Sequence, residues 1–143
     1  MQMNKILIKN TRIVDANKDF KSDLLVEDGK ISRIDTNIDS IDAKIINGEN
    51  YILMPSFIDM HTHLRDPGLT HKEDLETGQR AALKGGFTVL CPMANTKPAC
   101  DNKETMEYIL DKAEKLDLCD INQVCAITKN LEGQEMIDIE SMR

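Results

Sequence analysis

The side chains most suited to chemistry in this sequence lie in the ten residues 59–68, which read DMHTHLRDPG. This segment follows residues 51–58, an apolar run that predicts a buried strand entered after a proline. If the strand continues through the segment, successive side chains point to opposite faces. The alternation then predicts one shared face for Asp59, His61, His63 and Arg65, and the other face for Met60, Thr62 and Leu64.

The two histidines are candidate zinc ligands. Two residues of strand advance by roughly 6.6 Å, so His61 and His63 can lean toward one point between them. Neutral imidazole is a good zinc ligand. A His-x-His pair occurs often by chance, but here a strand precedes it, a turn at Asp66-Pro67-Gly68 follows it, and Arg65 shares its face. The pattern favours a site at the carboxyl end of a strand, where α/β folds place their chemistry.

These residues resemble the first barrel strand of dihydroorotases, in the metal-dependent cyclic amidohydrolase superfamily. The family pattern Pro-Gly-x-Ile-Asp-x-His-x-His-x-Arg-Asp-Pro-Gly matches residues 55–68, except that Ser56 replaces the usual glycine. The arginine is informative, because allantoinases and hydantoinases share the paired histidines but generally lack it. Residues 93–96, Met-Ala-Asn-Thr, also resemble family sequence. Read alone, Asn95 would be a turn residue before a proline.

The resemblance implies a function for these residues. His61 and His63 would bind one or two zinc ions, and His63, Arg65 and Asn95 would contact the substrate. The implied reaction is the reversible cyclisation of N-carbamoyl-L-aspartate to L-dihydroorotate in pyrimidine biosynthesis. Arg65 offers a planar fork suited to the substrate's α-carboxylate. The family also implies a small-molecule substrate and is compatible with a homodimer of the full-length protein, although the sequence does not determine the oligomeric state.

The same resemblance implies that much of the enzyme lies outside this sequence. A TIM barrel needs about 250 residues and eight strands, and residues 56–143 provide for three strands. The remaining zinc ligands and the general acid/base are expected beyond residue 143. No catalytic acid/base is therefore assigned here, and we expect the 143-residue chain to be an inactive N-terminal portion.

Two other functions remain open from the sequence. One is another cyclic amidohydrolase, of the allantoinase or hydantoinase/dihydropyrimidinase type, which would not need to bind an α-carboxylate. The other is a non-catalytic, dihydroorotase-like structural subunit, since a homologue can lose its ligands and keep its fold.

Composition excludes several other classes of protein. The formal net charge is −7 and no basic run occurs, which disfavours nucleic acid and anionic membranes as partners. No stretch has 18 consecutive apolar residues, and the first five residues do not lead into a signal-peptide core. The four cysteines lack Cys-x-x-Cys spacing, which favours reduced thiols in a cytoplasmic protein.

The hydrophobic pattern predicts an α/β fold with two parts. Residues 1–55 predict a small β subdomain, an incomplete sandwich with a hairpin at Asp28-Gly29. Residues 56–143 predict about three βα units of an incomplete TIM barrel. We expect strands that start at 57, 87 and 121, the second over 87–91 and the third over 121–128. We also expect a helix capped by Thr70 and Glu73 that runs to Gly85, a second opened by Asp101 and Glu104, and a third over 134–143.

Overall fold

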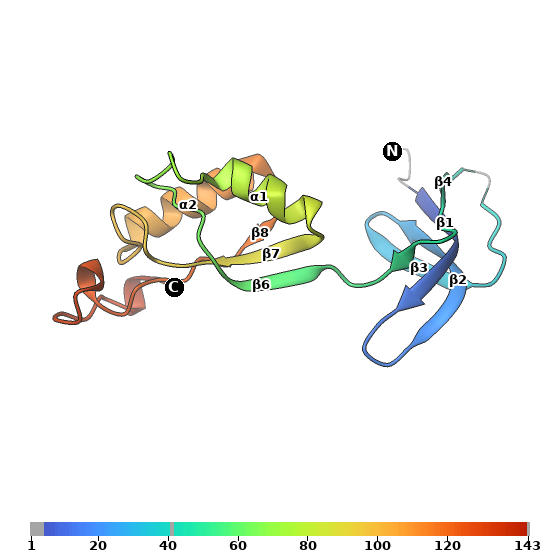
Figure 1. Cartoon of the computed structure of the whole chain (residues 1–143), viewed down its shortest axis with the longest axis horizontal. Helices are drawn as coiled ribbons and strands as arrows, with labels where there is room; N and C mark the ends of the chain where they lie inside the picture. The colour runs from blue at the N-terminus through green and yellow to red at the C-terminus, as the bar shows by residue number, and fades with distance from the viewer. Residues whose placement is uncertain (1–4, 41, 143) are drawn as a thin grey trace. The chain divides into compact units, whose positions relative to one another are not determined.

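The computed structural model describes residues 5–40 and 42–142 and divides the chain into two compact units, Met1–Pro55 and Ser56–Arg143. Figure 1 shows a β unit and an α/β unit. Residues 1–4, which we do not expect to lead into a signal-peptide core, lie outside the described residues, as does Arg143 at the end of the third expected helix. Within the described part, every helix is too short or too polar to cross a membrane.

The first unit is one five-stranded sheet with the order β3-β2-β1-β4, and β5 also pairs with β1. The two hairpin-connected pairs are antiparallel, whereas β4 and β5 run parallel to β1. Leu7, Leu25 and Ile38 form its core. The strands are β1 Lys5–Val14, β2 Asp19–Glu27, β3 Lys30–Asp35, β4 Lys44–Asn47 and β5 Ile52–Leu53.

The predicted hairpin at Asp28-Gly29 is confirmed: both residues have positive φ, 49° and 76°, as the favoured two-residue turn requires. The first strand, β1, has a register shift between Ile8 and Thr11 in its pairing with β2. Asn10 lies in this irregularity with φ 60°, and its N–H donates to Asp23 Oδ1 at 2.8 Å.

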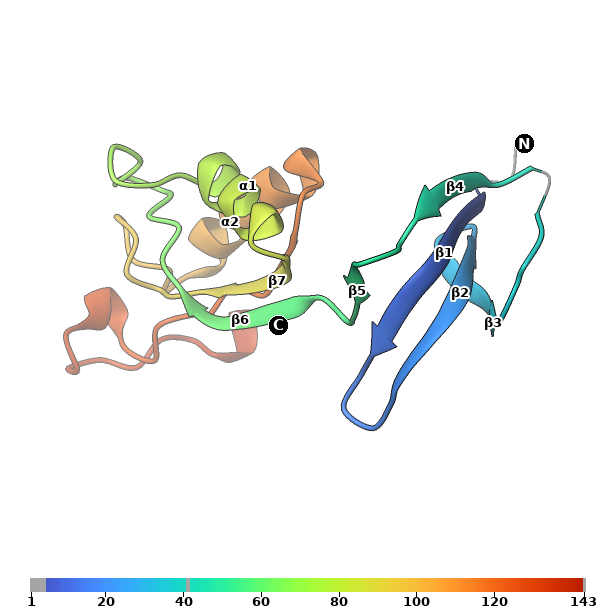
Figure 2. The same ribbon diagram turned by 45° about the vertical axis from the view of Figure 1, so that its right-hand side comes forward.

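The second unit places two helices on one face of a three-stranded parallel sheet with the order β6-β7-β8 (Figures 1 and 2). The strands are β6 Phe57–Thr62, β7 Phe87–Pro92 and β8 Asp120–Ile121, and the helices are α1 Leu75–Lys84 and α2 Lys103–Leu116. The buried core between the layers consists of Leu64, Leu75, Leu90, Ala94, Cys100, Ile109 and Ala126. The strand-helix alternation predicted for this half is therefore present.

The N-cap of helix α1 lies four residues after the predicted N-cap, Thr70. The N-cap is Asp74, whose side chain accepts from Thr77 N at 2.8 Å, while the Thr77 hydroxyl oxygen accepts from Asp74 N. The expected cap of Thr70 and Glu73 is wrong because the capping box of the next four residues, 74–77, forms instead. Gly78 of this helix packs closely against the loop after β6: a Cβ there would lie 2.5 Å from Leu64 Cδ2.

The end of the chain differs most from expectation. Strand β8 has two residues instead of eight, although Asn122 N and Val124 N still donate to carbonyls of β7 and its end. The helix expected over 134–143 is absent from the described residues up to 142. Lys129 N donates to Glu135 O at 2.8 Å and Ile137 N to Ile127 O at 3.1 Å. Because these groups pair across a loop, they cannot form i→i−4 helical bonds. Short 3₁₀ turns occupy Lys129–Leu131 and Glu140–Met142.

The second helix is shifted by one residue from its expected start. Its N-cap is Asn102, whose side chain accepts from Thr105 N at 2.9 Å. Asp101, which the sequence assigned to the cap, instead accepts from Asn130 N at 2.7 Å. The core-facing side of this helix is centred on Ile109 and Ala113, both buried.

Candidate active site

A β-bulge in β6 decides which side chains face the site. Asp59 pairs with Leu90 and Thr62 with Pro92, so three steps along β6 match two along β7. The extra residue interrupts the alternation of faces. The consecutive residues Met60 and His61 are therefore both exposed, and Met60 is 77% exposed. The shared face expected for Asp59 and the histidines is present only in part: Asp59 and His63 both line a hollow under α1 together with Gly78 and Ala82, whereas His61 is exposed.

The bulge brings the two histidines together at the end of β6. Their ring centroids are 5.2 Å apart and their planes are inclined by 75°. Asp59 contributes indirectly, because its Oδ1 accepts from His61 N at 3.0 Å and so holds the bulged backbone. Two imidazoles bound at about 2.0–2.1 Å to one tetrahedral zinc would have centroids roughly 5 Å apart. The pair therefore fits two positions of a zinc site.

Asn95 lies next to His63. Its Oδ1 is 2.9 Å from His63 Nδ1, and Met93 N donates to Thr62 O at 2.9 Å just before it. The loop after β7 is thus attached to the end of β6. With the amide oxygen as acceptor, His63 carries its proton on Nδ1 and leaves Nε2 free for a ligand. The Asn95 amide nitrogen remains available as a donor.

Arg65 follows in the same loop with a left-handed backbone, φ 57°. Its carbonyl accepts from Leu69 N at 3.0 Å, and its side chain is half-buried. Among residues 5–40 and 42–142, no hydrogen bond or ion pair to its guanidinium group occurs. A partly enclosed cation without a protein partner is suited to an anionic ligand.

The loops that carry Arg65 and Asn95 are in direct contact. Lys97 N donates to Pro67 O at 3.0 Å. Gly68 has φ 84°, and a Cβ on it would lie 1.8 Å from the Lys97 carbonyl oxygen. Only glycine fits here, because both the backbone conformation and the close approach exclude a side chain.

Asp66 is the residue whose role the sequence did not indicate. We had assigned it to the turn before Pro67, yet its carboxylate is buried and accepts from Lys112, Tyr108 and the backbone of Leu75. The long sequence separation from its α2 partners explains why no local pattern could identify it.

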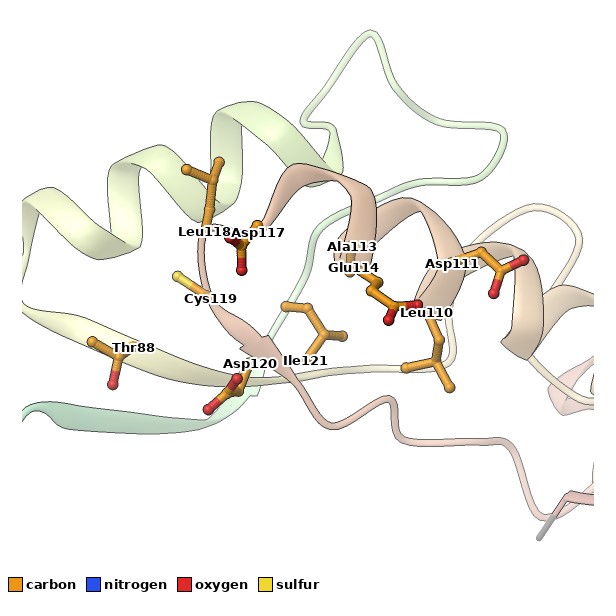
Figure 3. Close-up of a pocket in the computed structure, with 10 residues that line it drawn as sticks. All are labelled: Thr88, Leu110, Asp111, Ala113, Glu114, Asp117, Leu118, Cys119, Asp120 and Ile121. Atoms are coloured by element: carbon orange, nitrogen blue, oxygen red, sulfur yellow. The ribbon is translucent and has the colours of Figure 1, made fainter. Parts of the chain in front are cut away.

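One hollow of this unit lies away from the site. It has a volume of about 480 Å³ and lies between the end of α2 and the start of β8 (Figure 3). Thr88 and Asp120, near the beginnings of their strands, line it. His61 lies at the opposite, carboxyl end of the parallel sheet. In the described part of the chain, no cluster of three or more histidine, cysteine, aspartate or glutamate side chains could hold a metal.

Comparison with known proteins identifies the family. The dihydro-orotase-like family model matches residues 50–143, which include β6, β7 and both helices. The chain belongs to this family. It is 52% identical over 132 residues to a dihydroorotase of Clostridium botulinum (strain Eklund 17B / Type B), which covers 92% of this chain and 33% of that relative. The chain thus spans about a third of the length of the curated relatives it matches.

Solved structures show the same fold. An L-hydantoinase (dihydropyrimidinase) from Arthrobacter aurescens matches 88% of this dihydro-orotase-like chain and 28% of its own, with a TM-score of 0.79 and 23% identity. A D-hydantoinase (dihydropyrimidinase) from Thermus sp. matches 86% of this chain and 28% of its own, with a TM-score of 0.72 and 32% identity. The α/β fold predicted from the sequence, that of the N-terminal part of such an amidohydrolase, is confirmed.

Proposed function

We propose that this chain is the N-terminal third of a zinc-dependent dihydroorotase, which reversibly cyclises N-carbamoyl-L-aspartate to L-dihydroorotate in pyrimidine biosynthesis. The observation that carries the proposal is the guanidinium group of Arg65, which has no partner among the described residues and lies on a loop in contact with the loop that carries Asn95. The curated relatives named dihydroorotase, 42–52% identical to this chain, support it.

Arg65 and Asn95 would bind the α-carboxylate of the substrate. A guanidinium group donates two parallel hydrogen bonds to a carboxylate, and the free amide N–H of Asn95 supplies a further donor. Because both loops are attached to β6 and to each other, the donors are held in place before the substrate arrives, which reduces the ordering cost of binding.

His61 and His63 would hold zinc, together with ligands from the rest of the protein. When bound, zinc would polarise the carbonyl group under attack and lower the pKa of a bound water. The contact between His63 and Asn95 fixes one ring nitrogen as the donor, so that the other can face the metal or the substrate.

The rest of the barrel would complete this site. We propose that it supplies the other zinc ligands and the general acid/base, and that it covers the apolar face of β6, where Ile58 and Met60 are 60% and 77% exposed. The 143-residue polypeptide should then show no turnover with zinc and carbamoyl aspartate. Activity that appears only after mixing with the remaining two thirds would support this division, and turnover by the polypeptide alone would contradict it.

Substrate choice tests the assignment directly. The full-length protein should convert carbamoyl aspartate and dihydroorotate, which carry the carboxylate that Arg65 would bind. Hydantoin and allantoin lack that group and serve as the comparison. Turnover of either, without turnover of carbamoyl aspartate, would replace the proposal with the hydantoinase or allantoinase type.

The non-catalytic alternative is decided by metal content. A dihydroorotase should contain at least one zinc ion per full-length chain and should lose activity when a chelator removes it. Substoichiometric zinc, with no activity restored by added zinc, would favour a structural subunit.

A further inference from the structure

The carboxylate of Asp66 ties the loop after β6 to both helices. Lys112 Nζ lies 2.7 Å from Asp66 Oδ2, the Tyr108 hydroxyl donates to Oδ1 at 3.2 Å, and Leu75 N donates to Oδ2 at 3.4 Å. The Asp66 side chain is 1% exposed. A carboxylate this enclosed is stable only with such partners, because removing a charge from water without compensation is costly.

The partners are not equally enclosed. The Lys112 side chain is 40% exposed and Tyr108 is 46% exposed, so both reach inward from the surface of α2. The hydrogen bond from Lys112 to Asp66 raises the pKa of Lys112, against the opposing effect of its partial burial. Lys112 can therefore be changed with little disturbance to the apolar core, although Asp66 cannot.

Arg65 lies between two buried residues. Leu64 on one side is 4% exposed and belongs to the apolar core, and Asp66 on the other is fixed by α1 and α2. Arg65 itself has φ 57°, a conformation that residues other than glycine adopt at a cost. Its two neighbours must therefore hold the backbone that directs the guanidinium group.

We propose that Asp66, held by Lys112 and Tyr108, is a positioning residue that fixes Arg65 for the carboxylate of the substrate. The inference rests on the proposed function, since it concerns how that site binds its substrate. Asp66 itself, buried against the helices, would not touch the substrate. It would act through the backbone of Arg65, so its loss should weaken substrate binding more than it slows turnover.

The first test uses steady-state kinetics of the zinc-loaded full-length enzyme. Asp66→Asn should raise the KM for carbamoyl aspartate about tenfold to a hundredfold with a smaller change in kcat, as expected when a binding group is misplaced. Lys112→Met and Tyr108→Phe should change KM in the same direction. Lys103→Met is the matched control, because Lys103 lies on the same helix but pairs with exposed Glu107 at 3.7 Å.

The second test asks whether Asp66 acts through Arg65. In an Arg65→Ala background, Asp66→Asn should raise neither KM nor the Kd for dihydroorotate, measured calorimetrically, any further. If Asp66→Asn and Arg65→Ala multiply each other's effect on KM or Kd, the inference is overturned, because Asp66 would then act independently of Arg65.

The remaining outcomes are distinct. A fall in kcat at unchanged KM would indicate a general structural role and overturn the inference, while leaving the proposed function intact. If Asp66→Asn does not fold, Lys112→Met and Tyr108→Phe decide in its place, and unchanged KM in both overturns the inference. If the wild-type protein converts no carbamoyl aspartate, the proposed function fails, and the inference fails with it.

Discussion

Asn95 Oδ1 lies 2.9 Å from His63 Nδ1, so the same side chain that would bind the substrate also orients a proposed zinc ligand. The two residues are 32 positions apart and lie at the ends of neighbouring strands. An amide can do both because its oxygen accepts while its nitrogen donates. We therefore expect zinc affinity and substrate affinity to be separable by substitution at this position.

Asn95→Ala should lower both zinc content and kcat/KM, because it removes the acceptor of His63 and the proposed donor to the substrate. Loss of such a ligand-orienting contact typically costs 10–100-fold in metal affinity. Asn95→Asp keeps an acceptor for His63 but places a carboxylate near that of the substrate, so it should retain zinc and lose kcat/KM. Metal analysis by mass spectrometry and steady-state kinetics measure the two effects. Equal zinc loss in both variants would contradict this account.

Arg65→Ala should lower kcat/KM for carbamoyl aspartate, because a bidentate charged pair is lost. Truncating one partner of such a pair costs about 2–5 kcal/mol. Arg65→Lys should recover little, since an ammonium group lacks the planar fork. The control is Arg80→Ala, which removes an exposed arginine paired with Glu76 at 2.9 Å on α1. Full activity in Arg65→Ala would exclude the proposed carboxylate site.

Gly68→Ala should destabilise the protein and lower its activity. Its Cβ would meet a backbone oxygen of Lys97 at 1.8 Å, in addition to the penalty for an L-residue at φ 84°. Gly133→Ala isolates that penalty, because Gly133 has φ 71° and nothing within 4 Å of its would-be Cβ. The conformational penalty alone is about 1–2 kcal/mol. Thermal unfolding of the full-length protein should therefore show a larger loss for Gly68→Ala, and equal losses would argue against the contact between the loops.

Asp23→Asn should remove part of the acid sensitivity of the β unit. Burial tends to raise the pKa of Asp23, but hydrogen bonds from Asn10 N and Ile38 N and the charge of Lys9 outweigh it and lower the pKa below 3.8. A lowered native pKa adds stability above the unfolded value, and that stability is lost as pH falls through the native value. The variant should be less stable at pH 7, with a shallower decline below about pH 4.

Hydrogen exchange of the β1 and β2 amides in the full-length protein would measure this difference between pH 7 and pH 3. Asp19→Asn is the control, because Asp19 also pairs with a cation but its side chain is 51% exposed. Exposed pairs contribute little to stability. The same pH dependence in wild type and Asp23→Asn would show that Asp23 is not the group responsible.

The sequence predicted the parts of this structure that depend on local patterns. The Asp28-Gly29 turn was found because few other sequences permit two successive positive φ angles. The positions of His61, His63 and Asn95 at the ends of neighbouring strands followed from the order of strands and helices. Parallel strands connected by helices must place their carboxyl ends at the same edge.

The failures have physical causes beyond the local sequence. The β-bulge at residues 60–61 depends on pairing with β7, and alternation along β6 alone predicts none. Thr70 and Asp74 offer competing caps for α1, and only the tertiary position of the helix selects one. Residues 134–142 have apolar residues at helical spacing, yet their backbone pairs with residues 127–129. The burial of Asp66 depends on Lys112, 46 residues away.

The bulge in β6 makes the length of that strand part of the candidate site. Met60 and His61 are both exposed there, while Asp59 before the bulge and His63 after it both line the hollow under α1. Deleting one residue between Asp59 and Thr62 would shift both histidines by one place relative to Asp59 and turn each imidazole toward the other face of the sheet. Single substitutions in this strand can therefore leave the imidazoles in place, whereas an insertion or a deletion cannot.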